Sequence, residues 1–222
     1  MGRPKLLDRS RVVDVALCQY WQHGVDSVAM ADVARLSGFD RAGIYKEFGG
    51  ESGLVQEVLK AYSEQHWAPR LPVLASCESP AMKIKMILDA FVNDNVMKDL
   101  SPYGVKDKSL KWPRPPAKVK GCAFYGMVIS DSVATFTAKT KRQIKQVNEQ
   151  SRDWFTEVML DAKKLGELKE GVSVTEAVDF YSDQMLLMQM MRRMNFSKEH
   201  MLKATSMIMK SLFAEGVLAV KH

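Results

Sequence analysis

Cysteine and histidine are scarce in the 222-residue sequence, and this scarcity argues against several kinds of site. The three cysteines, Cys18, Cys77 and Cys122, are too few and too scattered for a disulfide framework, and no pair has the close spacing of zinc ligands. The four histidines are dispersed as well. We therefore expect no metal site and no bound cofactor.

Long apolar runs are also missing. No stretch approaches the roughly 18 apolar residues needed to span a bilayer, and residues 1–8 lack the apolar region of a secretory signal. The composition, with 46% hydrophobic and 26% charged residues, is that of a globular protein with one sizeable core or two small ones. These features predict a cytoplasmic protein that does not enter a membrane.

Acidic residues are outnumbered, but only in one part of the sequence. The formal net charge of +6 suggests a polyanionic partner such as nucleic acid. Residues 1–65 nevertheless hold 8 basic and 9 acidic side chains, whereas residues 66–222 hold 24 and 17. Residues 98–120, a proline-rich stretch with 7 basic and 2 acidic residues, should form a surface loop. That loop could extend DNA contact, admit an acidic ligand or simply be solvated.

Clean alternation of apolar and polar residues, typical of strands, is absent, and apolar residues recur at helical spacing instead. The sequence thus predicts an all-α protein of about nine helices. The buried stripe of the first helix would consist of Val12, Val13, Ala16, Leu17, Tyr20 and Trp21. Asp40, Ser79 and Ser197 are expected to cap later helices, and Ser173 with Glu176 fits a capping box.

Residues 31–48 have the layout of a helix-turn-helix: a short helix, a turn at Gly38 and a second short helix. The positions that such a unit needs apolar are occupied by Val33, Ala34, Leu36, Phe39, Ile44 and Phe48. On or near the outer face of the second helix lie Arg41, Ala42, Gly43, Tyr45 and Lys46. Small residues at 42 and 43 let the backbone approach a DNA groove. Arg41 can reach a base edge or a phosphate, and Tyr45 and Lys46 can contact phosphates.

This segment resembles the TetR family of transcriptional regulators. The family pattern is matched by Val33-Ala34, by Gly38 and by residues 43–48, and residues 121–124 look like the start of a core helix in one branch of the family. Two positions depart from the pattern. No Ser or Thr directly precedes the second helix, so either Asp26 or Ser27 caps it or the helix lacks one cap, worth about 1 kcal/mol. Glu51 stands where most members have lysine, and a carboxylate facing phosphates would lower DNA affinity.

The resemblance implies a helix-turn-helix DNA-binding domain at residues 1–50 and a helical ligand-binding and dimerisation domain at residues 51–222. It also implies a homodimer, in which residues 173–194 and 197–213 of each subunit form a four-helix interface. Each head would place its third helix in the major groove of a palindromic operator, and a small molecule in the core would shift the spacing of the heads. The basic arm with Arg3 and Lys5 could enter the adjacent minor groove.

The C-terminal part is rich in methionines and aromatic residues that suit an adaptable apolar ligand site, although core packing is the more common role of such residues. The candidate ligand-contact residues are Phe91, Trp112, Cys122, Tyr125, Trp154, Tyr181, Met185 and Met188. Cys122 follows Lys118, Lys120 and Gly121, an electropositive setting that could make it a thiol sensor of electrophiles. A small buried residue is the alternative reading of this cysteine.

Together these features predict a one-component bacterial regulator, not an enzyme, that represses transcription and is released from its operator by a small apolar or electrophilic inducer. Two alternatives stay open. One is a small helical thiol enzyme using Cys122, although no histidine lies near Cys122 in the sequence and no paired-carboxylate or phosphate-loop motif is visible. The other is a helical ligand-binding protein whose head has weak DNA affinity because of Glu51.

Overall fold

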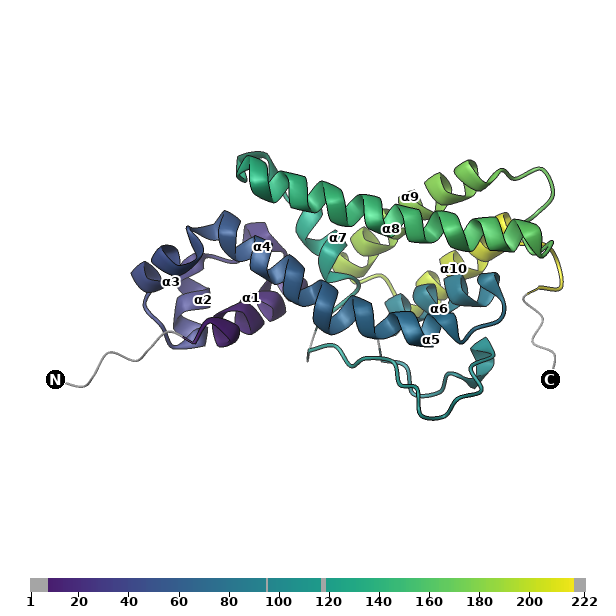
Figure 1. Ribbon diagram of the computed structural model, residues 1–222, viewed down its shortest axis with the longest axis horizontal. Helices are drawn as coiled ribbons and strands as arrows, with labels where there is room; N and C mark the ends of the chain where they lie inside the picture. Colours follow the sequence, from purple (N-terminus) through teal and green to yellow (C-terminus); the bar gives the residue numbers. More distant parts are fainter. Residues whose placement is uncertain (1–7, 95, 117–118, 218–222) are drawn as a thin grey trace. The chain divides into compact units, whose positions relative to one another are not determined.

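The computed structural model describes residues 8–94, 96–116 and 119–217, and it confirms the all-α class (Figure 1). The ten α-helices of this part are α1 (Arg9–His23), α2 (Met30–Ser37), α3 (Arg41–Phe48), α4 (Glu51–Tyr62), α5 (Leu71–Ala75), α6 (Pro80–Val92), α7 (Ala123–Val128), α8 (Ala138–Lys164), α9 (Val174–Arg193) and α10 (Lys198–Leu212). Short 3-10 turns include η1 (Val25–Ser27), η3 (Ala68–Arg70), η4 (Ser101–Tyr103) and η5 (Asp131–Thr135). None of these helices is long and apolar enough to cross a membrane.

The chain folds into two compact units. The first comprises Met1–Trp67 with Pro116–Gln146, and the second comprises Ala68–Pro115 with Val147–His222. Helix α8 is continuous and contributes its first turns to one unit and its remaining turns to the other. These units reflect packing, so the functional boundary expected at residue 50 stays a prediction.

Helix α1 forms the centre of the first unit, where it packs on α2, α4 and α7. All six residues of its predicted apolar stripe are buried, as expected for a helix surrounded by neighbours. The indole N–H of Trp21 donates to the carbonyl oxygen of Gly121 at 3.1 Å, and its ring meets the edges of Tyr62 and His66. Residues 100 positions apart in the sequence thus share one core.

Side-chain caps fix the starts of several helices. Asp40 caps α3, Ser79 caps α6, and Ser197 caps α10, while Ser173 and Glu176 form the predicted capping box of α9. Each cap satisfies backbone N–H groups that have no partner inside the helix.

Of the two alternatives for the start of α2, the structure shows the missing cap. Ala29 occupies the N-cap position, where no side chain accepts a hydrogen bond, and neither Asp26 nor Ser27 replaces it. The carboxylate of Asp26 instead accepts hydrogen bonds from the hydroxyls of Ser130 and Ser132 and from the backbone N–H groups of Asp131 and Ser132. The carboxylate of Asp26 therefore binds the start of η5, more than 100 residues away in the sequence, because four hydrogen-bond donors there engage it in place of the N–H groups at the start of α2.

The second unit is built around α6, whose side chains are almost all buried and against which α10 packs. Asp89 of α6 is buried and accepts hydrogen bonds from Lys85 and from the hydroxyl of Tyr103. This contact ties the segment after α6 to the helix. The stretch 98–120, expected as a surface loop, is mostly exposed but also buries Leu100, Tyr103, Val105, Trp112 and Val119.

Candidate nucleic-acid interface

The turn between α2 and α3 has the backbone geometry that the sequence predicts. Gly38 adopts a left-handed conformation with φ of +77°, which a glycine reaches without the steric cost of a β-carbon. The N–H groups of Gly38 and Phe39 both donate to the carbonyl oxygen of Ala34, at 3.0 and 3.1 Å. These bonds satisfy the end of α2 and direct the chain into α3.

Helices α2 and α3 pack through Val33, Ala34, Ile44 and Phe48, all buried, with Phe39 half-buried between them. The inward role predicted for Leu36 is wrong, because its side chain is 39% exposed. Ser37 is fully buried instead, and its hydroxyl donates to the carbonyl oxygen of Ala34. The inner face of α2 follows positions 30, 33, 34 and 37, and Leu36 lies outside this stripe at 100° per residue.

The outer face of α3 carries the predicted DNA-contact residues. Arg41, Ala42, Tyr45 and Lys46 are exposed and Gly43 is half-buried, whereas Ile44 and Phe48 point into the core. The guanidinium of Arg41 lies 5.3 Å from the centre of the Tyr45 ring and donates to the Tyr45 hydroxyl at 3.4 Å. Two exposed cations and a phenol therefore share one helix face, an arrangement suited to phosphate and base-edge contacts. Arg3 and Lys5 of the predicted arm lie outside the described residues.

The cap of α3 gives a second reason for glycine at position 43, besides close approach of the backbone to a DNA groove. Its N–H donates to Oδ1 of the capping Asp40 at 2.7 Å, and a β-carbon at this position would lie 3.0 Å from Oδ2 of the same carboxylate. Glycine at position 43 thus leaves room for the Asp40 cap at the start of α3, a role that was not predicted from the sequence.

Two contacts that orient α3 were not found from the sequence. Arg9 of α1 forms ion pairs with Glu47 of α3 at 2.5 Å and Glu57 of α4 at 3.0 Å, and its guanidinium lies 4.8 Å from the centre of the Phe48 ring. Gly53 of α4 lies so close to α3 that a β-carbon would be 1.7 Å from the carbonyl oxygen of Phe48. The ion pair joins residues 38 positions apart in the sequence, and the close backbone approach depends on tertiary packing. Neither contact can therefore be predicted from neighbouring residues.

Glu51 begins α4 and is half-buried. Burial raises the pKa of its carboxyl group above the ordinary value of 4.5, and the nearby Asp26 carboxylate raises it further. Part of this side chain is thus withdrawn from solvent by its own unit, and the lower DNA affinity expected from Glu51 stays a prediction.

The predicted ligand-contact residues fall into both compact units. Cys122 and Tyr125 belong to the first unit, where the Cys122 thiol lies 3.2 Å from the Tyr62 hydroxyl, and both residues are half-buried. Burial raises the pKa of Tyr125, and burial raises the pKa of Cys77 to about 11. Cys122 is thus more accessible than Cys77, which is buried.

The other predicted ligand residues belong to the second unit. Phe91, Trp112, Tyr181, Met185 and Met188 are buried there, and Trp154 is half-buried. Tyr181 packs on Phe155 with ring centres 4.6 Å apart, and Phe155 meets the edge of Trp154. Trp112 also lines a cavity formed by the segment after α6.

Helices α9 and α10 expose a set of large apolar side chains. These are Leu186, Leu187 and Met190 of α9, Met194 directly after it, and Leu202 and Met207 of α10. Met185, Met188 and Met191 are buried, so the methionines of α9 are divided between an inner and an outer face, as five in ten residues require.

Comparison with known proteins agrees with this geometry. Residues 12–58 match the family model of bacterial regulatory proteins of the tetR family. The HTH-type transcriptional repressor ComR of Escherichia coli (strain K12) is 32% identical over 82 residues, which are 37% of this chain and 39% of ComR. The chain thus spans less than half the length of this curated relative.

Solved structures share the fold over nearly the whole chain. A cysteine mutant of the TetR family transcriptional regulator CifR, bound to a 26-bp double-strand operator DNA, has a TM-score of 0.70 at 18% identity and covers 95% of this chain and 100% of its own. A transcriptional regulator from Saccharomonospora viridis in complex with choline has a TM-score of 0.68 at 12% identity, covering 93% and 97%. The N-terminal helices of this chain thus match the tetR family model, and the fold over nearly the whole chain is that of solved TetR family transcriptional regulators.

Proposed function

We propose that this regulator binds a palindromic operator as a homodimer, represses transcription there, and is released by a small apolar or electrophilic molecule. The observation that carries the proposal is the outer face of α3, where Arg41, Tyr45 and Lys46 stand exposed on a helix that a glycine turn and an Asp40 cap hold in place. A helix so presented fits the major groove. The solved CifR complex with operator DNA supports the same use of this fold.

The dimer would form through α9 and α10. Six large apolar side chains exposed on or beside two consecutive helices are a patch that a monomer in water would not leave uncovered. A second copy of the same helices would cover it by two-fold symmetry. Two heads held one helical turn of DNA apart could then read the two half-sites of a palindrome.

The inducer would bind among the apolar and aromatic side chains of the helical part. The choline complex of the Saccharomonospora viridis protein supports small-molecule binding by a chain of this fold. Cys122 would add a covalent route for electrophiles, because this residue is partly exposed. Its thiol lies beside the Tyr62 hydroxyl. A molecule that binds the released state better than the operator-bound state would shift the population towards release.

The decisive experiment is a gel shift and footprint on the intergenic DNA upstream of the protein's own gene. The wild-type protein should protect a palindrome at low salt, and the double variant Arg41→Ala/Lys46→Ala should bind at least about 30-fold more weakly, since each lost contact to a base or phosphate costs about 1–3 kcal/mol. Lys60→Ala is the control, because Lys60 is an exposed cation of α4 that pairs with Glu64. Absence of a protected palindrome, or equal losses in both variants, would refute DNA recognition by α3.

A further inference from the structure

The segment after α6 encloses a cavity of about 680 Å³ within the second unit. Small-molecule sites in proteins have volumes of roughly 300–1,000 Å³. All of the lining residues come from positions 97–112, so the cavity is formed by this one segment. Its size is thus in the range of a ligand site, and Trp112 is the lining residue that it shares with the ligand-contact residues predicted from the sequence.

The inner part of the cavity is lined by apolar side chains. Leu100, Val105 and Trp112 are buried, and Met97 and Leu110 are half-buried. Trp112 is only 5% exposed, yet its indole N–H has no acceptor in the part of the chain that the structure describes. A buried N–H without a partner costs free energy unless a ligand or water accepts from it. The guanidinium of the buried Arg70 lies 5.2 Å from the centre of the Trp112 ring and adds a positive charge close to the indole.

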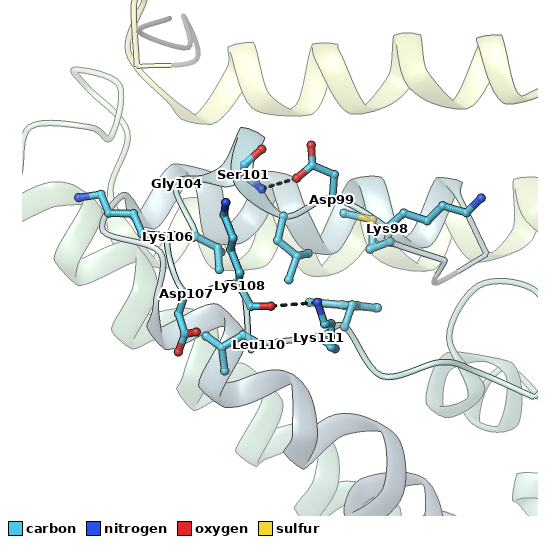
Figure 2. A pocket seen from close by; sticks show the side chains of 13 residues that line it. Lys98, Asp99, Ser101, Gly104, Lys106, Asp107, Lys108, Leu110 and Lys111 are labelled. Atoms are coloured by element: carbon cyan, nitrogen blue, oxygen red, sulfur yellow. Dashed lines mark hydrogen bonds between the residues drawn. The ribbon is translucent and has the colours of Figure 1, made fainter.

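The outer part of the cavity is basic. Figure 2 shows Lys98, Lys106, Lys108 and Lys111 around it. Lys106 pairs with Glu78, and the ammonium of Lys111 donates to the carbonyl oxygen of Lys108. The ammonium groups of Lys98 and Lys108 make no hydrogen bond or ion pair with any described residue, so both remain available to a ligand.

The two acidic residues of the lining neutralise only part of this positive charge. Asp99 accepts from the backbone N–H of Ser101, and Asp107 accepts from the N–H and hydroxyl of Ser109. Both carboxylates are thus engaged in holding the turns of the segment. Four lysines against two aspartates leave a net charge of +2 on the lining.

We propose that this cavity binds an amphipathic organic anion. Its apolar body would lie against Leu100, Val105 and Trp112. Its carboxylate, sulfonate or phosphate group would lie between Lys98 and Lys108. A neutral molecule of the same shape would gain the apolar contacts but not the charge contacts, and would bind more weakly.

The test uses two dyes with the same ring system. Anilinonaphthalene sulfonate carries an anionic group, and N-phenylnaphthylamine lacks it; both fluoresce more strongly in apolar sites. The variant Lys98→Gln/Lys108→Gln should bind the anionic dye about fivefold or more weakly and the neutral dye within about twofold of wild type, since only the charge contacts are removed. Total energy transfer from the protein's four tryptophans to the anionic dye should be smaller in Trp112→Phe than in the wild type.

The matched control is Lys139→Gln/Arg142→Gln, which removes the same charge from exposed residues of α8 in the other unit. This control should bind both dyes like wild type. The proposal is overturned if the Lys98/Lys108 variant keeps wild-type affinity for the anionic dye, if the control loses as much, or if the neutral dye is lost equally. Operator binding plays no part in the readout, so the result is independent of the proposed function.

Discussion

At the scale of single residues, the head depends on positions where a side chain would intrude. Gly53 brings α4 against the end of α3, and Gly43 leaves room for the capping carboxylate of Asp40. The two glycines differ in what surrounds them. The obstacle at Gly53 is the fixed carbonyl oxygen of Phe48, whereas the obstacle at Gly43 is a side chain that can rotate away.

Gly53→Ala should therefore destabilise the protein by about 2 kcal/mol or more, because a β-carbon 1.7 Å from the Phe48 carbonyl oxygen forces the two helices apart. Gly43→Ala should cost less than about 1 kcal/mol, since the better helix propensity of alanine offsets the disturbed cap. Urea unfolding at neutral pH measures both values. Equal losses in the two variants would show that the close approach at Gly53 does not limit stability.

Cys122 is the residue at which a covalent inducer can be tested. If its thiolate adds to an electrophilic carbon, Cys122→Ser should bind operator DNA like wild type but no longer release it when an electrophile is added. Cys77→Ser is the control, because burial raises the pKa of that thiol to about 11 and keeps it protonated. A Cys122→Ser variant that still responds would exclude this route. Consumption of many electrophile molecules per protomer would favour the thiol-enzyme alternative instead.

At the scale of elements, polar contacts join segments that are distant in sequence. The hydroxyl of Ser52, in the first turn of α4, lies 2.7 Å from the hydroxyl of the fully buried Thr140 of α8, to which Gln56 also donates. Asp26 connects η1 to the start of η5 in a similar way. The position of residues 130–146 against the head thus depends on hydrogen bonds as well as on apolar packing.

The Asp26 contact predicts a specific loss of stability in acid. The hydrogen bonds from Ser132, Ser130 and Asp131 lower the pKa of Asp26 from 3.8 to about 2. A depressed pKa contributes stability that is present above pH 4 and is lost as the pH falls from about 4 to 2. The carboxylate is exposed, so solvent screening limits the contribution to about 1 kcal/mol or less.

Urea unfolding at pH 7, 4 and 3 should show a smaller loss between pH 4 and 3 for Asp26→Asn than for wild type. Asp32→Asn is the control, because that carboxylate pairs with the exposed Arg35 on the helix surface. An unchanged pH dependence in Asp26→Asn would mean that these hydrogen bonds do not stabilise the folded state.

Local signals in the sequence were sufficient for the helices and the helix-turn-helix. Asp40, Ser173 and Ser197 cap helices as expected because a cap involves only a few neighbouring residues. The contacts of Arg9, Asp26 and Gly53 could not be predicted, since their partners are defined by tertiary packing. The same holds for the cavity of residues 97–112, where the lysines were visible in the sequence but the burial of Trp112 was not.

At the scale of the whole molecule, the exposed apolar side chains of α9 and α10 are the surface on which the proposed dimer depends. Leu187 and Met190 are 48% and 50% exposed, which is unfavourable for neighbouring large apolar residues in water. These two residues therefore test the proposed interface.

The variant Leu187→Glu/Met190→Glu should be a monomer in sedimentation or light-scattering measurements at micromolar concentration, because a two-fold interface would bring four carboxylates together. Operator affinity should fall with it, since one head contacts only a half-site. Leu160→Glu, a change at an exposed leucine of α8, should stay dimeric. A Leu187/Met190 variant that still sediments as a dimer would exclude this face as the interface.

The return of residues 116–146 to the N-terminal helices has a consequence for synthesis and engineering. The core around Trp21 is closed by Gly121 and α7, so a ribosome must release more than half of the chain before the head can acquire its final packing. A fragment ending at residue 67 would expose the buried face of α1 that contacts α7. The head of this protein should consequently not be transferable to another regulator as an N-terminal module unless residues 116–146 accompany it.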